Sequence, residues 1–405
     1  MNIRHQLKLR GNHRGQILPM FVVLLPILLL FVGLTIDLGM AYVTKSALSK
    51  AADAAALAAM KNIKQGQAVA QQLAQQAFNA NYAAFGSNSP MPTVNVQITT
   101  NAANNTVVNV SATAQLNAFF LGILPGYKTI NVSTASQTTR PKLIMSLVLD
   151  KSGSMNKNGG ATALPPAVTN FLSYFDDSSD QVAEVSFSTK SSIDVAMETN
   201  FTSPITSAVD GMKFTGATFT QAGLSDGLTQ ITGVNVPSGQ NVIKVAVFFT
   251  DGWANTIENT LSCPASTLLE VGGCAPPEQA VGWCKNYSFM NPTTGGTYKG
   301  CTATTFPSQQ TGSSEDLTTE NISNDAMYRA NVVANQMRAQ GIVVYAIGLG
   351  DKISESFLQQ IANDPASSSY DGTQPIGEAV FAPTAADLQG VFQDIANKIL
   401  LRISQ

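Results

Sequence analysis

The feature that most constrains this chain is an uncharged apolar run near its N-terminus, ILPMFVVLLPILLLFVGLTI, from Ile17 to Ile36. A helix needs about twenty apolar residues to cross the roughly 30 Å of bilayer hydrocarbon, and this run has that length. A cleaved secretory signal has an apolar core of about 7 to 15 residues and then a small-residue cleavage site. Here Asp37 and a long helical pattern follow instead. The run therefore predicts a single, uncleaved membrane span.

The charges around the run predict its orientation. Before Gln16 the chain carries the basic residues Arg4, Lys8, Arg10 and Arg14 and no acidic residue. Because basic flanks stay on the cytoplasmic side, we expect a cytoplasmic N-terminus and export of the remainder. The net charge of all 405 residues is only -3. A nucleic-acid partner is not expected, since binding phosphates requires a basic surface.

Histidine is absent from the body of the chain, because the only 2 histidines are His5 and His13 in the basic tip. This absence excludes Ser-His-Asp and Cys-His nucleophilic catalysis, and any His-ligated metal, from the rest of the protein. We therefore expect that the protein is not an enzyme.

Residues 46–140 are expected to form a stalk helix and a small β module. The Ala- and Gln-rich sequence after the span predicts a helix that continues out of the membrane. Its composition favours a solvated stalk, with a close contact to another helix through Ala51, Ala55, Ala58 and Ala59 as the alternative. The alternating runs TVNVQITT and TVVNVSATAQL, separated by NAANN, predict a β-hairpin, and KTINVSTASQTT a further strand.

From residue 141 to 405 apolar strand patterns alternate with helical patterns. This order predicts an α/β fold with a doubly wound, mostly parallel sheet covered on both faces. Ligands of such sheets bind outside the carboxyl ends of the strands, where Asp150 and Asp251 each follow an apolar run. Five oxygen-bearing side chains are expected to meet there: Asp150, Ser152, Ser154, Thr218 and Asp251. Thr220 is the alternative to Thr218, and Asx or Ser turns that merely close loops are the alternative to a metal site.

An insertion at about residues 255–324 interrupts the α/β pattern and contains all 4 cysteines. They are Cys263, Cys274, Cys284 and Cys301. No C-x-x-C pair favours zinc, so in an exported, loop-rich segment we expect two disulfides, whose pairing the sequence leaves open. Trp253, Trp283 and Tyr287 are candidate ligand contacts by location and residue type.

The N-terminal features occur in an order that resembles a known family. A basic leader, an apolar span that ends in Asp37-Leu38-Gly39, and then LSKAADAAALAAM resemble the first part of TadG-type proteins of the bacterial tight-adherence (Flp) pilus assembly system. The resemblance implies a single-pass protein of the bacterial inner membrane, anchored by residues 1–45, whose partners are other pilus-assembly proteins. The sequence QILPM after Gly15 lacks the Glu of related pseudopilins. This departure favours an anchor that is not processed.

The DKSGS motif, the loop threonine and the strand-ending TDG resemble the metal-ion-dependent adhesion site of von Willebrand factor A domains. The resemblance implies Mg²⁺ or Mn²⁺ bound directly by Ser152 and Ser154, and directly or through water by Asp150, Thr218 and Asp251. Such a site binds an acidic side chain of a protein ligand. The expected function is thus a membrane-anchored adhesion or pilus-assembly protein, with a metal-independent envelope scaffold as the alternative.

Overall fold

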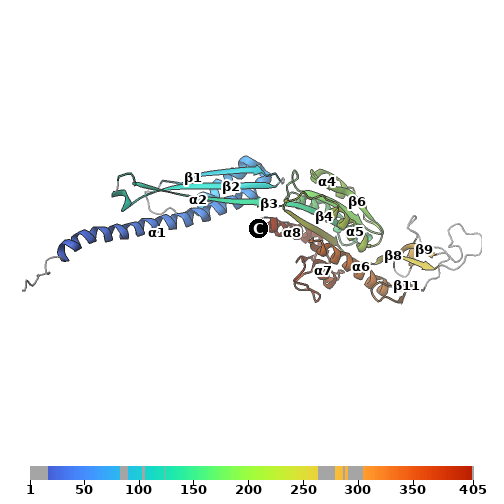
Figure 1. The fold of residues 1–405 in the computed structure, drawn as a ribbon. Helices are drawn as coiled ribbons and strands as arrows, with labels where there is room; N and C mark the ends of the chain where they lie inside the picture. The colour runs from blue at the N-terminus through green and yellow to red at the C-terminus, as the bar shows by residue number, and fades with distance from the viewer. Residues whose placement is uncertain are drawn as a thin grey trace, which may run out of the picture. The chain divides into compact units, whose positions relative to one another are not determined.

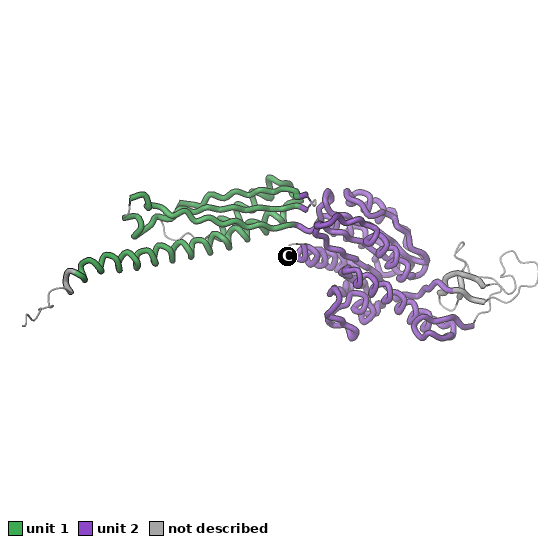
Figure 2. Tube along the Cα trace, in the orientation of Figure 1, with its two compact units in different colours: residues 1–101, 106–139 green, residues 102–105, 140–405 purple. Residues whose placement is uncertain are grey.

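The structure is a computed structural model that describes residues 17–82, 90–102, 105–123, 125–262, 279–285, 288–290 and 304–403. The chain divides into two compact units (Figure 2). Unit 1 comprises residues 1–101 and 106–139, and unit 2 comprises residues 102–105 and 140–405.

Unit 1 is built on a 45-residue helix, α1 (Ile17–Lys61). Of the described helices it is the one that is long and apolar enough to cross a membrane, judged by length and composition. Figure 1 shows its C-terminal half beside α2 (Gln67–Asn81) and a three-stranded sheet. The strands are β1 (Thr93–Thr100), β2 (Thr106–Asn117) and β3 (Thr129–Arg140), with a 3-10 turn, η3 (Leu121–Ile123), between β2 and β3.

The expectation of one continuous, solvated stalk helix was wrong. A short 3-10 turn, η2 (Ile63–Gln65), ends α1, and Gly66 adopts φ 98, a conformation that a residue with a Cβ rarely takes. The chain then starts a second helix. Ala51, Ala55 and Ala59 are fully buried in one apolar cluster with Phe78 of α2 and side chains of β2. The small alanines thus allow a close helix contact, and the contacting helix belongs to the same unit.

Unit 2 contains a six-stranded sheet in the order β14-β13-β7-β4-β5-β6. All neighbouring strands pair in parallel except β5 and the edge strand β6, which pair antiparallel. The strands are β4 (Lys142–Asp150), β5 (Gln181–Phe187), β6 (Ser191–Glu198), β7 (Val242–Thr250), β13 (Val343–Leu349) and β14 (Glu378–Ala382). This arrangement confirms the predicted doubly wound, mostly parallel fold.

Helices cover both faces of this sheet (Figure 1). Alternate residues of β4, such as Leu147 and Val148, enter two separate apolar clusters because successive side chains of a strand point to opposite faces. One cluster includes residues of α3 (Gly160–Leu172), α4 (Thr202–Asp210) and α8 (Leu388–Ile403). The other includes residues of α5 (Thr220–Thr232), α6 (Thr319–Ala339) and α7 (Glu355–Ala362).

Outside the insertion, two strands and a helix of unit 2 were not predicted: the edge strands β6 and β14 and the helix α4. The edge strands are partly exposed: β6 mixes polar and apolar residues, and β14 has only four consecutive apolar residues. β6 also pairs with β5 through an irregular register between Val182 and Val185. The apolar patterns that predict the central strands therefore do not predict β6 or β14.

The insertion after β7 forms small antiparallel sheets where the sequence predicted loops. One sheet has the order β10-β9-β8, from β8 (Thr256–Ser262), β9 (Gln279–Lys285) and β10 (Ser288–Met290). A second pairs β11 (Thr305–Pro307) with β12 (Ser314–Asp316). The buried pair Arg329–Asp325, at 2.7 Å on α6, fixes the base of the insertion, because Arg329 also donates to the Glu258 carbonyl at 2.8 Å.

Candidate metal centre

Two carboxylates end neighbouring strands of the sheet in unit 2. Asp150 is the last residue of β4, and Asp251 directly follows β7, which pairs in parallel with β4. Both are buried, with 0% and 1% of their surface exposed. The parallel pairing places the two carboxylates at the same edge of the sheet, as the sequence predicted.

A chain of hydroxyl groups reaches from the first loop to the second carboxylate. The loop after β4 turns through a short 3-10 helix, η4 (Gly153–Asn156). The hydroxyls of Ser152 and Ser154 lie 2.9 Å apart, and the Ser154 hydroxyl donates to Oδ1 of Asp251 at 2.6 Å. The backbone N–H of Ser152 donates to Oδ1 of Asp150 at 2.7 Å. Four of the five predicted side chains thus form one connected group.

The loop that carries Thr218 is tied to both neighbouring loops. Gly153 N–H donates to the Gly216 carbonyl at 3.2 Å, which joins it to the Ser152 loop. Asn255, just after Asp251, accepts from Thr218 N–H at 2.9 Å through its side chain and donates its own N–H to the Thr218 carbonyl at 3.1 Å. Thr218 is held at the same edge of the sheet by its backbone.

Sequence reasoning missed three polar residues that position this group. The Thr250 hydroxyl donates to Oδ2 of Asp150 at 2.6 Å, and the Asn158 amide donates to Oδ2 of Asp251 at 3.0 Å. Asn255 orients the Thr218 backbone. The available signal for Thr250 and Asn255 was their position within five residues of Asp251, but nothing in the spacing distinguishes them from ordinary loop residues.

Burial and mutual repulsion disfavour two negative charges at this edge. Burial, together with the charge of Asp251, raises the pKa of Asp150 to about 7. Burial also raises the pKa of Asp251, although its hydrogen bonds from Ser154 and Asn158 act in the opposite direction. A divalent cation between the carboxylates would compensate both effects.

The alternative threonine, Thr220, is the first residue of α5. Its hydroxyl is buried and has no hydrogen-bond partner among the described residues. Thr218 is also buried. Burial and position therefore do not distinguish Thr218 from Thr220 as the cation ligand.

The donor set fits a hard cation such as Mg²⁺, which prefers oxygen ligands and retains waters. Nowhere in the described ranges do three or more His, Cys, Asp or Glu side chains gather closely enough to hold a metal. A cation at this edge would thus depend on two carboxylates supplemented by hydroxyls. Such a site keeps open positions for water or for a carboxylate from another protein.

The predicted ligand contacts and disulfides lie mostly outside the described residues. Trp253 lies next to the site and is 49% exposed. Tyr287 and the cysteines Cys263, Cys274 and Cys301 fall outside the described ranges. Trp283 and Cys284 belong to β9, for which the structure describes the backbone. The two disulfides remain a prediction.

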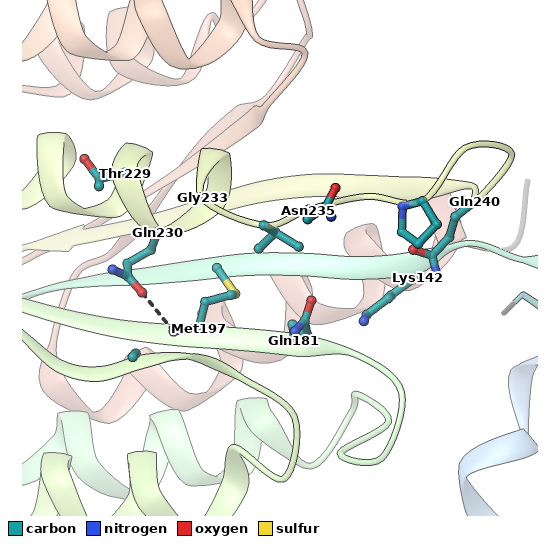
Figure 3. Close-up of a pocket in the computed structure, with 11 residues that line it drawn as sticks. Lys142, Gln181, Met197, Thr229, Gln230, Gly233, Asn235 and Gln240 are labelled. Atoms are coloured by element: carbon teal, nitrogen blue, oxygen red, sulfur yellow. Dashed lines mark hydrogen bonds between the residues drawn. The ribbon is translucent and has the colours of Figure 1, made fainter. Parts of the chain in front are cut away.

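A separate pocket of unit 2 lies at the other end of the strands (Figure 3). Lys142 and Gln181, which begin β4 and β5, line it together with Met197, whose N–H donates to the Gln230 side chain at 2.8 Å. Lys142 and Asp150 are the two ends of a nine-residue strand, so the pocket is roughly 26 Å from the carboxylates at about 3.3 Å per residue. It is not part of the candidate metal centre.

The sheet with helices on both faces, and the Asp-x-Ser-x-Ser loop at its carboxyl edge, define unit 2 as a von Willebrand factor type A domain. The family model of that name matches residues 145–271. A second model, "Putative Flp pilus-assembly TadE/G-like", matches residues 15–76. The chain thus joins a TadE/G-like N-terminal segment to a type A domain, which confirms both resemblances. No curated protein sequence matches the chain.

Solved structures with a similar fold include pilus proteins. The pilus adhesin SpaC from Lactobacillus rhamnosus GG is 17% identical with a TM-score of 0.43, and the match covers 79% of this chain and 36% of SpaC. The von Willebrand factor domain of the pilus tip protein Mfa5 from Porphyromonas gingivalis is 15% identical with a TM-score of 0.43 and covers 66% of this chain and 98% of that domain. Proximal thread matrix protein 1 from the mussel byssus, whose structure is described as having a "zinc occupied MIDAS motif", is 16% identical with a TM-score of 0.37, and the match covers 64% of this chain and 46% of that chain. This chain therefore spans about a third of SpaC.

Proposed function

We propose that this protein is a membrane-anchored pilus-assembly or adhesion protein whose type A domain binds a protein ligand through a divalent cation. The observation that carries the proposal is the connected group of Asp150, Ser152, Ser154 and Asp251, with Thr218 held beside it by Asn255. The proposed ligand is an acidic side chain of another pilus-assembly protein or of a surface protein. Recognition by this site requires no bond-breaking step, and we propose that the protein is not an enzyme.

The chain's own residues prepare the site for the cation. Ser152, Ser154, Asp150, Thr218 and Asp251 would hold Mg²⁺ or Mn²⁺, which supplies an electrophilic position for an incoming carboxylate. Thr250 and Asn158 each hold one oxygen of a carboxylate. The other oxygen of Asp251 accepts from the Ser154 hydroxyl, and the other oxygen of Asp150 accepts from the Ser152 backbone N–H. Exposed Trp253 borders this edge and offers an aromatic contact to the ligand.

The proposed topology places residues 1–45 in and below the inner membrane and the type A domain on the exported side. It rests on the apolar helix α1 and the basic residues before it. An alkaline phosphatase fused after residue 140 should be active in cells, and the four cysteines should resist alkylation until they are reduced. An inactive fusion would contradict the topology, and four free thiols would contradict the proposed disulfides.

The alternative function is a metal-independent scaffold of the pilus secretion machinery. A scaffold that held its partner through the Ala-rich helix face would need that face to be free. Ala51, Ala55 and Ala59 are fully buried inside unit 1, so that face is occupied by the protein itself. The observations therefore favour the metal-dependent function.

Thermal unfolding of the full chain in detergent, with chelator and then with excess Mg²⁺ or Mn²⁺, tests the proposal. A cation that binds only the folded state at about 100 times its Kd adds about 2.7 kcal/mol of stability. We expect this gain in the wild type and in Asp210→Asn, which changes an exposed carboxylate of the same unit, and its loss in Ser152→Ala. Equal melting with chelator and with metal would contradict the proposal and leave the scaffold function.

A further inference from the structure

A loop of unit 1 lies beside the apolar part of α1. This β2–β3 loop, described over residues 118–123 and 125–128, extends along α1 beyond the end of α2 (Figure 1). An apolar hollow of about 330 Å³ separates the two. Its lining comes from one face of α1 and from the loop: Pro26, Leu29, Leu30, Leu34, Phe120, Leu121 and Ile123.

The buried carboxylate of Asp37 fixes the loop to the helix. It accepts three consecutive backbone N–H groups, from Phe119 at 2.9 Å, Phe120 at 3.1 Å and Leu121 at 2.7 Å. One turn earlier on α1, a Cβ added to Gly33 would lie 2.4 Å from Cβ of Phe120, so only glycine admits the phenylalanine this closely. These two contacts therefore fix the position of the loop along the axis of α1.

The loop lies beside the part of α1 that forms the proposed membrane span. Asp37 directly follows the apolar run of residues 17–36. Pro26 and Asp37 are 11 residues apart, which corresponds to about 16 Å along a helix and to about half of a 30 Å hydrocarbon layer. Since the loop contacts the hollow from Pro26 to Leu34, it runs beside the exported half of the span.

In the first half of the loop, residues 118–123, most backbone N–H groups have hydrogen-bond partners, as a non-aqueous environment demands. Ala118 N–H donates to the Lys128 carbonyl at 3.0 Å, and Ile123 N–H donates to the Phe120 carbonyl at 3.2 Å. Together with the three N–H groups bound by Asp37, these bonds satisfy most donors of residues 118–123. An unsatisfied backbone group in hydrocarbon costs several kcal/mol, whereas water would satisfy it freely.

The side chains of the loop are also distributed as a membrane interface requires. Phe119 and Ile123 are 76% and 78% exposed although both are large and apolar. Tyr127 and Lys128, at the base of the loop, are exposed as well. Aromatic and basic residues at the edge of an apolar surface are typical of the headgroup level.

We propose that the β2–β3 loop inserts into the outer leaflet of the inner membrane beside α1, with acyl chains in contact with Phe119, Ile123 and the apolar hollow. The occupant is lipid because the loop continues the exposed apolar surface of α1, on which residues 20–32 are exposed. The proposal rests on the membrane anchor of the proposed function. Unit 1 would then be held by two elements, so its orientation to the bilayer is fixed where a single helix would allow rotation.

Tryptophan quenching by brominated lipid tests the insertion. The full chain carries Trp253→Phe and Trp283→Phe, so one introduced tryptophan reports alone. Each single-tryptophan protein is reconstituted in phosphatidylcholine vesicles with bromine on the acyl chains. We expect strong quenching of Ile123→Trp and of the anchor reference Leu29→Trp, and no quenching of Gln97→Trp, an exposed position of β1 in the same unit. Adding Asp37→Ala to Ile123→Trp should reduce its quenching by at least half, since the loop loses its attachment, and should leave Leu29→Trp unchanged.

The outcomes separate the loop from the anchor. Quenching of Leu29→Trp without quenching of Ile123→Trp would overturn the insertion while the anchor stands. Absence of quenching at both positions would overturn the anchor itself. Shielding of Ile123→Trp from both brominated lipid and aqueous iodide would show that protein covers the loop, and this too would overturn the proposal.

Discussion

The Ser154 hydroxyl donates to Oδ1 of Asp251 at 2.6 Å, although the two residues are 97 positions apart in the chain. This bond joins the loop after β4 to the end of β7. Parallel pairing of the two strands brings the loops to one edge. Ser152 then connects the carboxylates, because its backbone N–H donates to Asp150 and its hydroxyl contacts that of Ser154. A cation-binding group is thus assembled from segments that are remote in sequence.

The hydroxyl of Thr250 is expected to be a positioning group for Asp150. Thr250→Val keeps the side-chain shape but removes the 2.6 Å hydrogen bond to a buried carboxylate, so we expect a loss of about 1–3 kcal/mol in unfolding free energy. We also expect weaker Mn²⁺ binding in a calorimetric titration. Thr250→Ser, which retains the hydroxyl, should restore most of the affinity. Wild-type Mn²⁺ affinity in Thr250→Val would contradict this role.

Gly216 should tolerate no side chain. Its φ is +90, and an added Cβ would lie 2.7 Å from the Thr189 hydroxyl. Gly216→Ala should therefore destabilise unit 2 by about 1–3 kcal/mol and displace the loop that holds Thr218. Urea unfolding measures the loss. Gly211→Ala is the matched control, because Gly211 adopts an ordinary helical φ of -84 in the same connection. Equal losses in both variants would be inconsistent with strain at Gly216.

The buried side chain of Glu184 on β5 should make the stability of the protein depend on pH. Neither of its carboxylate oxygens has a hydrogen-bond partner among the described residues. Burial and, to a smaller extent, the charge of Asp194 raise its pKa from 4.5 to about 8, against the opposing charge of Lys151. Between these pH values the unfolded chain releases a proton that the folded chain keeps, so stability falls as pH rises from 4.5 to about 8.

Glu184→Gln should remove this dependence. At about 1.4 kcal/mol per pKa unit, the wild type loses up to about 5 kcal/mol across that range relative to the variant. Urea unfolding at several pH values measures the difference. Glu198→Gln, an exposed glutamate of the adjacent strand β6, should retain the wild-type slope. Parallel pH curves for wild type and Glu184→Gln would show that the side chain is ionised in the folded state.

The ion pair between Asp325 and Arg329 should control the base of the insertion. Arg329→Met leaves a buried carboxylate without its cation, which typically costs about 3–5 kcal/mol. It also frees the Glu258 carbonyl, so limited proteolysis should cleave the insertion faster. In the double variant Asp325→Leu/Arg329→Met no buried charge remains, and we expect recovery of most of the stability. A double variant as unstable as Arg329→Met would mean that the hydrogen bonds to Ser308 and Gln310 matter more than the charge.

The sequence by itself determined the membrane-length apolar run, the alternation of strands and helices, and the Asp-x-Ser-x-Ser loop, because each depends on local periodicity or spacing. The parallel sheet then places Asp150 and Asp251 at one edge by a general rule of such folds. Fold and candidate site could therefore be predicted together.

Only the tertiary structure decided which surfaces are covered. The Ala-rich face of α1 is compatible with solvent or with a partner helix, and a positive φ at Gly66 brings α2 onto it. Asp37 looked like the end of a span, yet its carboxylate binds a loop more than eighty residues away. Likewise, Thr250, Asn158 and Asn255 gain their roles from distances across loops. Local sequence patterns do not predict such contacts, because a hydrogen bond between segments remote in sequence depends on how the intervening strands and helices pack.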